Sequence, residues 1–219
     1  MHLGENLFSA RLVERRHLIT IYEKSGRELD VVIFCGVHPA IAVAAATSYG
    51  MGLNELELAN TLMSDSLECI EVNGCDVPSH AEVVMTGKIR DELSTEGPFV
   101  DLTSTYDIER EQPVVEISKV YHRDEFYYQS ILPGGAEHRL LMGVPQEPRI
   151  YKVVSNTCPS VRDVVLSEGG GCWLHGVVSI DKKVDGEAVN VGMAALGAHS
   201  SMKRVIVVDA DIDVTDEKD

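Results

Sequence analysis

The chain has 219 residues, a formal net charge of −16 and 44% hydrophobic residues. This length can bury a core as one large domain or two small ones. The acidic balance argues against nucleic acid and anionic membranes as partners, and no apolar run reaches the roughly 20 residues of a membrane span. The N-terminus lacks the layout of a signal peptide and the five cysteines form no CxxC pair, so we expect a soluble cytoplasmic protein with reduced thiols.

The first part of the chain mixes helices with strands. Residues 16–26 predict a short helix that ends at Gly26, and residues 29–36 predict a buried strand. Two more helices are predicted over 38–48, with Pro39 in the first turn, and over 54–65, with Asn54 as the N-cap. Four later segments read as antiparallel strands because their apolar residues alternate or run together. These segments are residues 66–72, 80–89, 112–122 and 124–135.

The last part of the chain alternates strands and helices, which is typical of an α/β domain. Helices are predicted over 149–157 and 186–199, and strands over 161–167, 172–181 and 203–213. The change of pattern and the run MGVPQEP place a boundary near residues 142–147. We therefore expect two domains, residues 1–142 and residues 143–219.

Residues 96–101 read EGPFVD, so that Glu96 and Asp101 flank a stiff Gly-Pro-Phe-Val segment. Taken alone, this arrangement has two interpretations. One is a surface turn between strands, where acidic residues are common. The other is a pair of catalytic carboxylates held on a rigid loop.

Six segments, in the same order along the chain, resemble the UbiD family of decarboxylases, which use prenylated flavin mononucleotide. They are RHL (16–18), GVHPAIAVAAAT with GLNE (36–55), VPSHAEVVMTGKI (77–89), EGPFVDLT (96–103), the segment from Tyr121 to Gly143, and KRVIVVDADIDV (203–214). The residues of the fourth and fifth segments are most similar to those of the archaeal branch of this family. The resemblance implies an α+β fold, in which a split β-barrel of the flavin-reductase type binds the flavin and a smaller α/β domain follows.

The resemblance also implies roles for five residues. Glu96 pairs with an arginine, and Asp101 is the proton donor and acceptor at the substrate carbon. His17 and Glu55 are two of three ligands of a divalent metal, manganese first, that holds the flavin phosphate, with potassium as a further candidate ion. Arg16, with His17, contacts the flavin or its phosphate. Without the resemblance, His17, Glu55 and Arg16 read as ordinary residues of helix starts.

The activity implied is non-oxidative decarboxylation, or carboxylation, of an α,β-unsaturated or aromatic acid through a prenylated-flavin adduct. trans-Anhydromevalonate 5-phosphate and a 4-hydroxybenzoate-type acid are both candidate substrates. A flavin prenyltransferase would supply the cofactor. The alternatives are a non-catalytic subunit or truncated remnant of such an enzyme, and a simple flavin reductase-like protein that would bind unmodified flavin and would not need both Glu96 and Asp101.

Family members are about twice as long, with a catalytic arginine and a metal-binding asparagine that would fall upstream of Met1. Asn6 and Arg11 have the same mutual spacing but lie closer to His17 than the family pattern places them. Val100 stands where many members have glycine. We therefore expect the 219-residue chain to need an upstream segment or a separate N-terminal subunit for activity and firm flavin binding. We also expect it to form oligomers.

Overall fold

The computed structural model describes residues 2–4, 7–9, 17–48 and 52–216. The chain divides into two compact units, which are described separately. The first unit comprises residues 1–41, 50–101 and 105–130, and the second comprises residues 42–49, 102–104 and 131–219. The expected division into domains over 1–142 and 143–219 remains a prediction.

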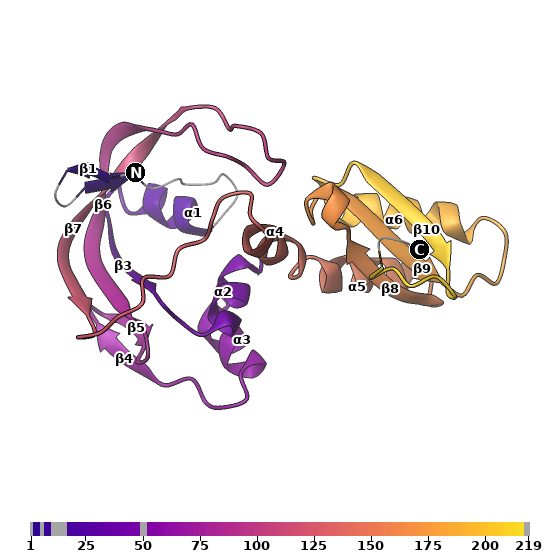
Figure 1. Cartoon of the computed structure of the whole chain (residues 1–219), viewed down its shortest axis with the longest axis horizontal. Coiled ribbons are helices and arrows are strands. Elements are labelled where there is room, and N and C mark those ends of the chain that lie inside the picture. Colours follow the sequence, from indigo (N-terminus) through magenta and orange to yellow (C-terminus); the bar gives the residue numbers. More distant parts are fainter. Residues whose placement is uncertain (1, 5–6, 10–16, 49–51, 217–219) are drawn as a thin grey trace. The chain divides into compact units, whose positions relative to one another are not determined.

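The first unit is built on a five-stranded antiparallel sheet with the strand order β1-β2-β7-β6-β3. Its strands are β1 (His2–Gly4), β2 (Leu7–Ser9), β3 (Leu29–Cys35), β6 (Val83–Glu96) and β7 (Arg110–His122). The two long strands β6 and β7 pair from Val83 opposite His122 to Glu96 opposite Arg110. The sheet curls around helix α1 (His17–Lys24), which lies against its concave face (Figure 1).

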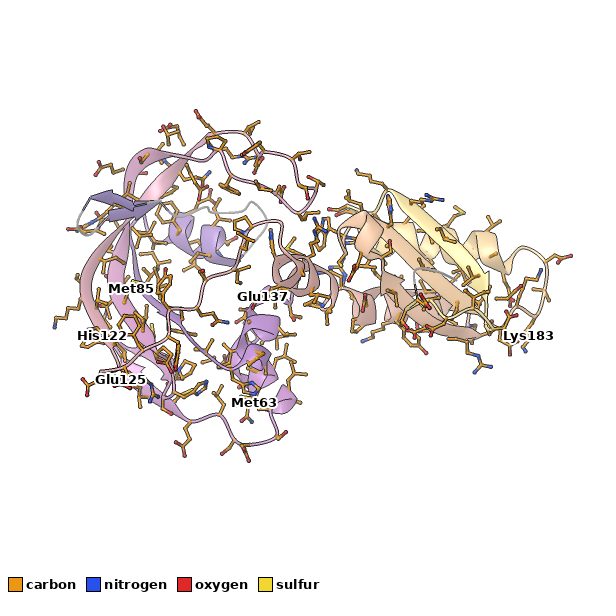
Figure 2. The ribbon with its side chains drawn as sticks, in the orientation of Figure 1. Met63, Met85, His122, Glu125, Glu137 and Lys183 are labelled. Atoms are coloured by element: carbon orange, nitrogen blue, oxygen red, sulfur yellow. The ribbon has the colours of Figure 1, made fainter. Side chains whose placement is uncertain are left out.

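The core of the first unit forms where α1 packs on the sheet. Tyr22 of α1 is buried with Ile89 of β6 and with Val115 and Ile117 of β7. Met85 of β6, labelled in Figure 2, packs against this group. The Tyr22 hydroxyl donates a hydrogen bond of 3.1 Å to the carbonyl of Arg90. The sheet and its helix therefore share one apolar interior, which keeps β6 and β7 in register.

The predicted helix over 16–26 is confirmed for its described part. It ends as expected at Gly26, which has a φ of +80°. The strand over 29–36 also forms, but the expectation that it is buried is wrong. Within the described sheet β3 pairs only with β6, and all of its residues remain at least partly exposed. Cys35 is half-buried, and this burial raises the pKa of its thiol.

The two predicted helices between β3 and β6 form as α2 (Pro39–Ala46) and α3 (Glu55–Leu62). Asn54 caps α3, because its side-chain oxygen accepts a hydrogen bond of 2.9 Å from the backbone N–H of Leu56. A separate two-stranded hairpin follows, made of β4 (Cys69–Val72) and β5 (Cys75–Pro78).

The predicted strand over residues 124–135 is wrong, because this segment is irregular after β7 ends at His122 (Figure 2). Side chains satisfy backbone groups here in place of a strand ladder. The Gln129 side-chain oxygen accepts hydrogen bonds from the N–H groups of Gly36 and Val37, at 3.2 and 3.3 Å. The N–H of Tyr127 donates to the Glu82 carboxylate at 3.2 Å. Apolar residues that suggested a strand, such as Tyr127, are instead exposed.

The second unit contains a three-stranded sheet with the order β10-β9-β8, in which β10 and β9 are parallel and β9 and β8 are antiparallel. Its elements are α4 (Ala136–Gly143), α5 (Glu147–Thr157), β8 (Val161–Leu166), the short 3₁₀ helix η1 (Glu168–Gly170), β9 (His175–Ile180), α6 (Glu187–Ala198) and β10 (Arg204–Asp209). All the strands and helices predicted for this part are confirmed. Helix α4 was not predicted.

Helices α5 and α6 pack on the sheet of the second unit and form its core. Ile150 and Val154 of α5, Val178 of β9, and Val191 and Ala195 of α6 are fully buried. A buried histidine makes a polar contact at one end of this core. His199 is buried, and its Nε2–H donates a hydrogen bond of 3.0 Å to the carbonyl of Trp173. Burial is the main cause that lowers the pKa of His199.

All five cysteines are free, at described positions. Among the residues that the structure describes, no helix has the length and apolar character needed to cross a membrane.

Candidate active site

The two predicted catalytic acids lie on one arm of an irregular hairpin that extends β6 and β7. Glu96 is the last residue of β6, and Asp101 stands five positions later at the far end of the same arm. Between them Gly97 has a φ of +96°, a left-handed backbone conformation that favours glycine. The N–H of Asp101 donates a hydrogen bond of 2.8 Å to the carbonyl of Thr105, which fixes the end of the arm.

The opposite arm carries an ion pair that the sequence had not indicated. Arg110 stands across the ladder from Glu96. Its two terminal nitrogens donate to the two carboxylate oxygens of Asp107, at 2.5 and 2.9 Å. The N–H of Asp107 in turn donates a hydrogen bond of 2.8 Å to the carbonyl of Phe99, halfway along the acid-bearing arm. The fork of Arg110 is therefore held opposite the segment that joins the two acids.

The charges of the two acids and of Arg110 belong to one electrostatic group. Hydrogen bonds to Asp107 are the main cause that raises the pKa of Arg110, and the negative charges of Asp107, Glu96 and Asp101 act in the same direction. Glu96 and Asp101 are both partly exposed. The structure thus sets both carboxyl groups on one arm, where their charges act on Arg110 and water reaches them. Carboxyl groups in contact with water can take part in proton transfer.

The predicted metal ligands are only partly described. Glu55 is the first residue of α3 and is partly exposed. His17 is the first residue of α1, but its side chain lies outside the described part of the chain, as does all of Arg16. The rival pair Asn6 and Arg11 also lies outside it. The pairing of His17 with Glu55 therefore stays a prediction.

The donor chemistry indicates how far these residues fit the implied metal. Manganese accepts carboxylate and imidazole ligands, so that Glu55 and His17 are suitable in kind. In the described ranges, however, no group of three or more His, Cys, Asp or Glu side chains could hold a metal ion. The described residues alone therefore do not make up a complete set of metal ligands.

Sequence alone could have suggested Arg110 by one signal. It is the only basic residue between Glu96 and Glu111, and an acid lies three positions before it. The register that sets it opposite Glu96 could not be read in advance, because the β6–β7 ladder shifts at Thr86/Gly87 and again at Ile89/Leu93.

Two family descriptions cover this chain. The 3-octaprenyl-4-hydroxybenzoate carboxy-lyase Rift-related domain (UbiD) matches residues 1–136. The corresponding C-terminal domain matches residues 139–219.

One similar protein is the anhydromevalonate phosphate decarboxylase of Methanocaldococcus jannaschii. It is 48% identical over 213 residues, which are 95% of this chain and 50% of the relative. The chain thus spans about half the length of this relative.

Solved structures agree with the family descriptions. The UbiD-class enzyme HmfF of Pelotomaculum thermopropionicum in complex with FMN has a TM-score of 0.94 and 36% identity, over 99% of this chain and 50% of HmfF. An evolved dimeric form of HmfF in complex with prFMN has a TM-score of 0.94 and 36% identity, over 99% of this chain and 52% of that one. On the extent of these matches and the order of its motifs, the chain belongs to the UbiD family.

Proposed function

We propose that this chain is part of a UbiD-type decarboxylase that acts on trans-anhydromevalonate 5-phosphate. The observation that carries the proposal is the 48% identity to an anhydromevalonate phosphate decarboxylase over nearly the whole chain. Of the two candidate substrates left open by the sequence, the hydroxybenzoate type has the support of the general family description. The more specific likeness favours the isoprenoid-type phosphate.

Prenylated FMN is the proposed cofactor, supported by the prFMN and FMN in the two similar HmfF structures. A flavin prenyltransferase would provide it. We propose that Arg16, His17 and Glu55 hold the flavin phosphate through manganese, with potassium as a further candidate ion. A negatively charged chain needs such local cations to bind phosphate. We also propose that the protein works in the cytoplasm and forms oligomers, and the dimeric state of one HmfF form supports the second of these points.

The split β-barrel is likewise proposed, for residues 1–142, with an α/β domain over 143–219. Two observations support this division. The first unit contains a strongly curved antiparallel sheet and a separate two-stranded hairpin. The two family domains meet between residues 136 and 139, close to the proposed boundary.

In the proposed reaction, the bond between the carboxyl carbon and its neighbouring carbon breaks and carbon dioxide leaves. The electron pair stays on the neighbouring carbon, and the prenylated flavin, when bound, supplies the conjugated system that accepts it. Asp101 gives its proton to this carbon, and a proton from solvent restores Asp101. The partial exposure of Asp101 supports the second transfer, because water reaches the side chain.

Glu96 supplies the second carboxyl group on the same arm. Two acids on the same arm can divide the work, one carrying the proton and the other the charge. The fixed ends of the arm, Glu96 in the β6–β7 ladder and Asp101 bound to Thr105, keep that division from depending on a mobile loop.

The experiment compares Asp101→Asn with Glu109→Gln in the complete protein, co-expressed with a flavin prenyltransferase. Glu109 is an exposed acid on the other arm of the hairpin, so that its variant controls for the loss of one negative charge. We expect Asp101→Asn to lose at least about 100-fold in turnover of trans-anhydromevalonate 5-phosphate, the usual contribution of a general acid, and to retain flavin absorbance. Glu109→Gln should keep both. Parental turnover in Asp101→Asn would refute the role of Asp101, and turnover of 4-hydroxybenzoate alone would refute the substrate.

A further inference from the structure

The hairpin that carries Glu96 and Asp101 is rich in acidic residues. Between residues 96 and 111 it carries five acids and a single cation, Arg110. The acids are Glu96, Asp101, Asp107, Glu109 and Glu111. Like charges at such spacing repel one another and favour a splayed hairpin. A cation fixed inside the segment offsets that repulsion.

Arg110 is fixed in place by more than one contact. Asp107 binds both of its terminal nitrogens, and one of these nitrogens also donates to the carbonyl of Ile108 at 3.4 Å. The Asp107 carboxylate is further held by the backbone N–H of Ile108 at 2.9 Å. Only 13% of the Asp107 side chain is exposed, compared with 33% of Arg110, so that the pair is more shielded than an ordinary surface ion pair.

The position of this pair relates it to both acids. The backbone N–H of Asp107 donates a hydrogen bond to the carbonyl of Phe99, which lies between Glu96 and Asp101 in the chain. Arg110 stands opposite Glu96 in the ladder. The negative charges that act on Arg110 come from both arms: Glu96 and Asp101 from the first, and Asp107 from its own. The neighbouring acid Glu111 is engaged elsewhere, since it accepts a hydrogen bond of 2.7 Å from the Thr95 hydroxyl.

We propose that Arg110, clamped by Asp107, is a positioning residue for the acid pair Glu96 and Asp101. It has two effects. Its fork holds the second arm of the hairpin in place against the first arm, and its charge offsets the repulsion between the acids. The inference rests on the proposed function, because it concerns the same two acids.

The two effects can be separated by substitution. Arg110→Lys keeps the charge but loses the bidentate fork, because an ammonium group is a single point of contact. Arg110→Gln loses the charge as well. A control exists on the same pair of strands: Arg90 of β6 donates from Nε and Nη2 to one carboxylate oxygen of Glu116 of β7, at 2.8 and 2.6 Å, and from Nη1 to Glu28 at 3.3 Å. Arg90→Gln therefore removes a comparable ion pair away from the two acids.

The first measurement is hydrogen exchange of the Asp101 and Asp107 backbone amides in the complete protein. Arg110→Gln and Arg110→Lys should both exchange about two- to fivefold faster than the parent, as expected for loss of a partly exposed ion pair. Arg90→Gln should match the parent at these two amides. Parental exchange in both Arg110 variants would overturn the clamping effect.

The second measurement is the rate of decarboxylation by the flavin-loaded enzyme. Without the cation, the repulsion between the acids is no longer offset, so that turnover by Arg110→Gln should fall about two- to fivefold. Arg110→Lys, which keeps the charge, should recover most of that loss, and Arg90→Gln should match the parent. Parental turnover in Arg110→Gln, or an equal loss in Arg110→Lys or Arg90→Gln, would overturn the effect of charge. Activity of Asp101→Asn would instead refute the proposed function and leave the exchange result standing.

Discussion

Ile150 should be a major contributor to the stability of the second unit. It is fully buried on α5 within the main apolar core of that unit. Ile150→Ala removes three carbon atoms, worth about 2.4 kcal/mol by transfer alone at about 0.8 kcal/mol for each buried carbon. The cavity left behind adds to this, so that we expect a loss of about 3–4 kcal/mol, within the range observed for such changes. Ile150→Val, which removes one carbon, should cost about 1 kcal/mol.

The chain contains its own reporter for this experiment. Trp173 is the only tryptophan and belongs to the second unit, so that its fluorescence during urea or thermal unfolding follows that unit alone. At about 4–8 °C per kcal/mol for a domain of this size, Ile150→Ala should lower Tm by more than about 10 °C. Val189→Ala on α6 is the control, because 66% of Val189 is exposed. A loss below about 0.5 kcal/mol for Ile150→Ala, or an equal loss for Val189→Ala, would refute the assignment of Ile150 to the core.

Two further outcomes are expected. Glu55→Ala should lose bound metal, measured by elemental analysis, and bound flavin, measured by absorbance. Glu57 is an exposed acid in the same helical turn, so that Glu57→Ala should retain both. Equal metal content in the two variants would remove Glu55 from the ligand set. Because the pKa of His199 is lowered in the folded protein, the unfolded chain binds more protons just below its ordinary value of 6.5, and stability must fall as the pH drops through that value. The urea midpoint measured by Trp173 fluorescence should therefore be lower at pH 5.5 than at pH 7.5, and the difference between the two midpoints should be smaller in His199→Gln. An equal difference in parent and variant would show that other groups cause the change.

Local signals predicted the helices well because their causes are local. Asn54 caps α3 through its own side chain, and Gly26 ends α1 with a backbone conformation that glycine adopts easily. The failures have causes distant in sequence. Residues 124–135 have the apolar content of a strand, but Gln129 bonds to Gly36 and Val37, more than 90 positions away, and takes the segment out of the sheet.

The residues of the candidate site also differ in how far a local signal could predict them. Glu96 and Asp101 could be proposed as site residues from the family resemblance of a short motif, because both acids and the segment between them are six consecutive residues. The position of Arg110 opposite Glu96 could not be predicted, because it depends on the register of two long strands with two irregularities between them. Helix α4 was missed because its sequence, AEHRLLMG, follows Pro133 and two glycines that indicated only a turn.

The exposed edge of β3 has a consequence for handling the protein in solution. This strand reads LDVVIFC and, in the described sheet, is paired on one side only. A β-branched edge of this kind can recruit the same edge of another molecule and start aggregation. Asp30 interrupts it at one end, with 70% of its side chain exposed, and the net charge of −16 keeps molecules apart. High salt screens that repulsion, so concentrated samples should be most soluble at low ionic strength and should precipitate near their acidic isoelectric point.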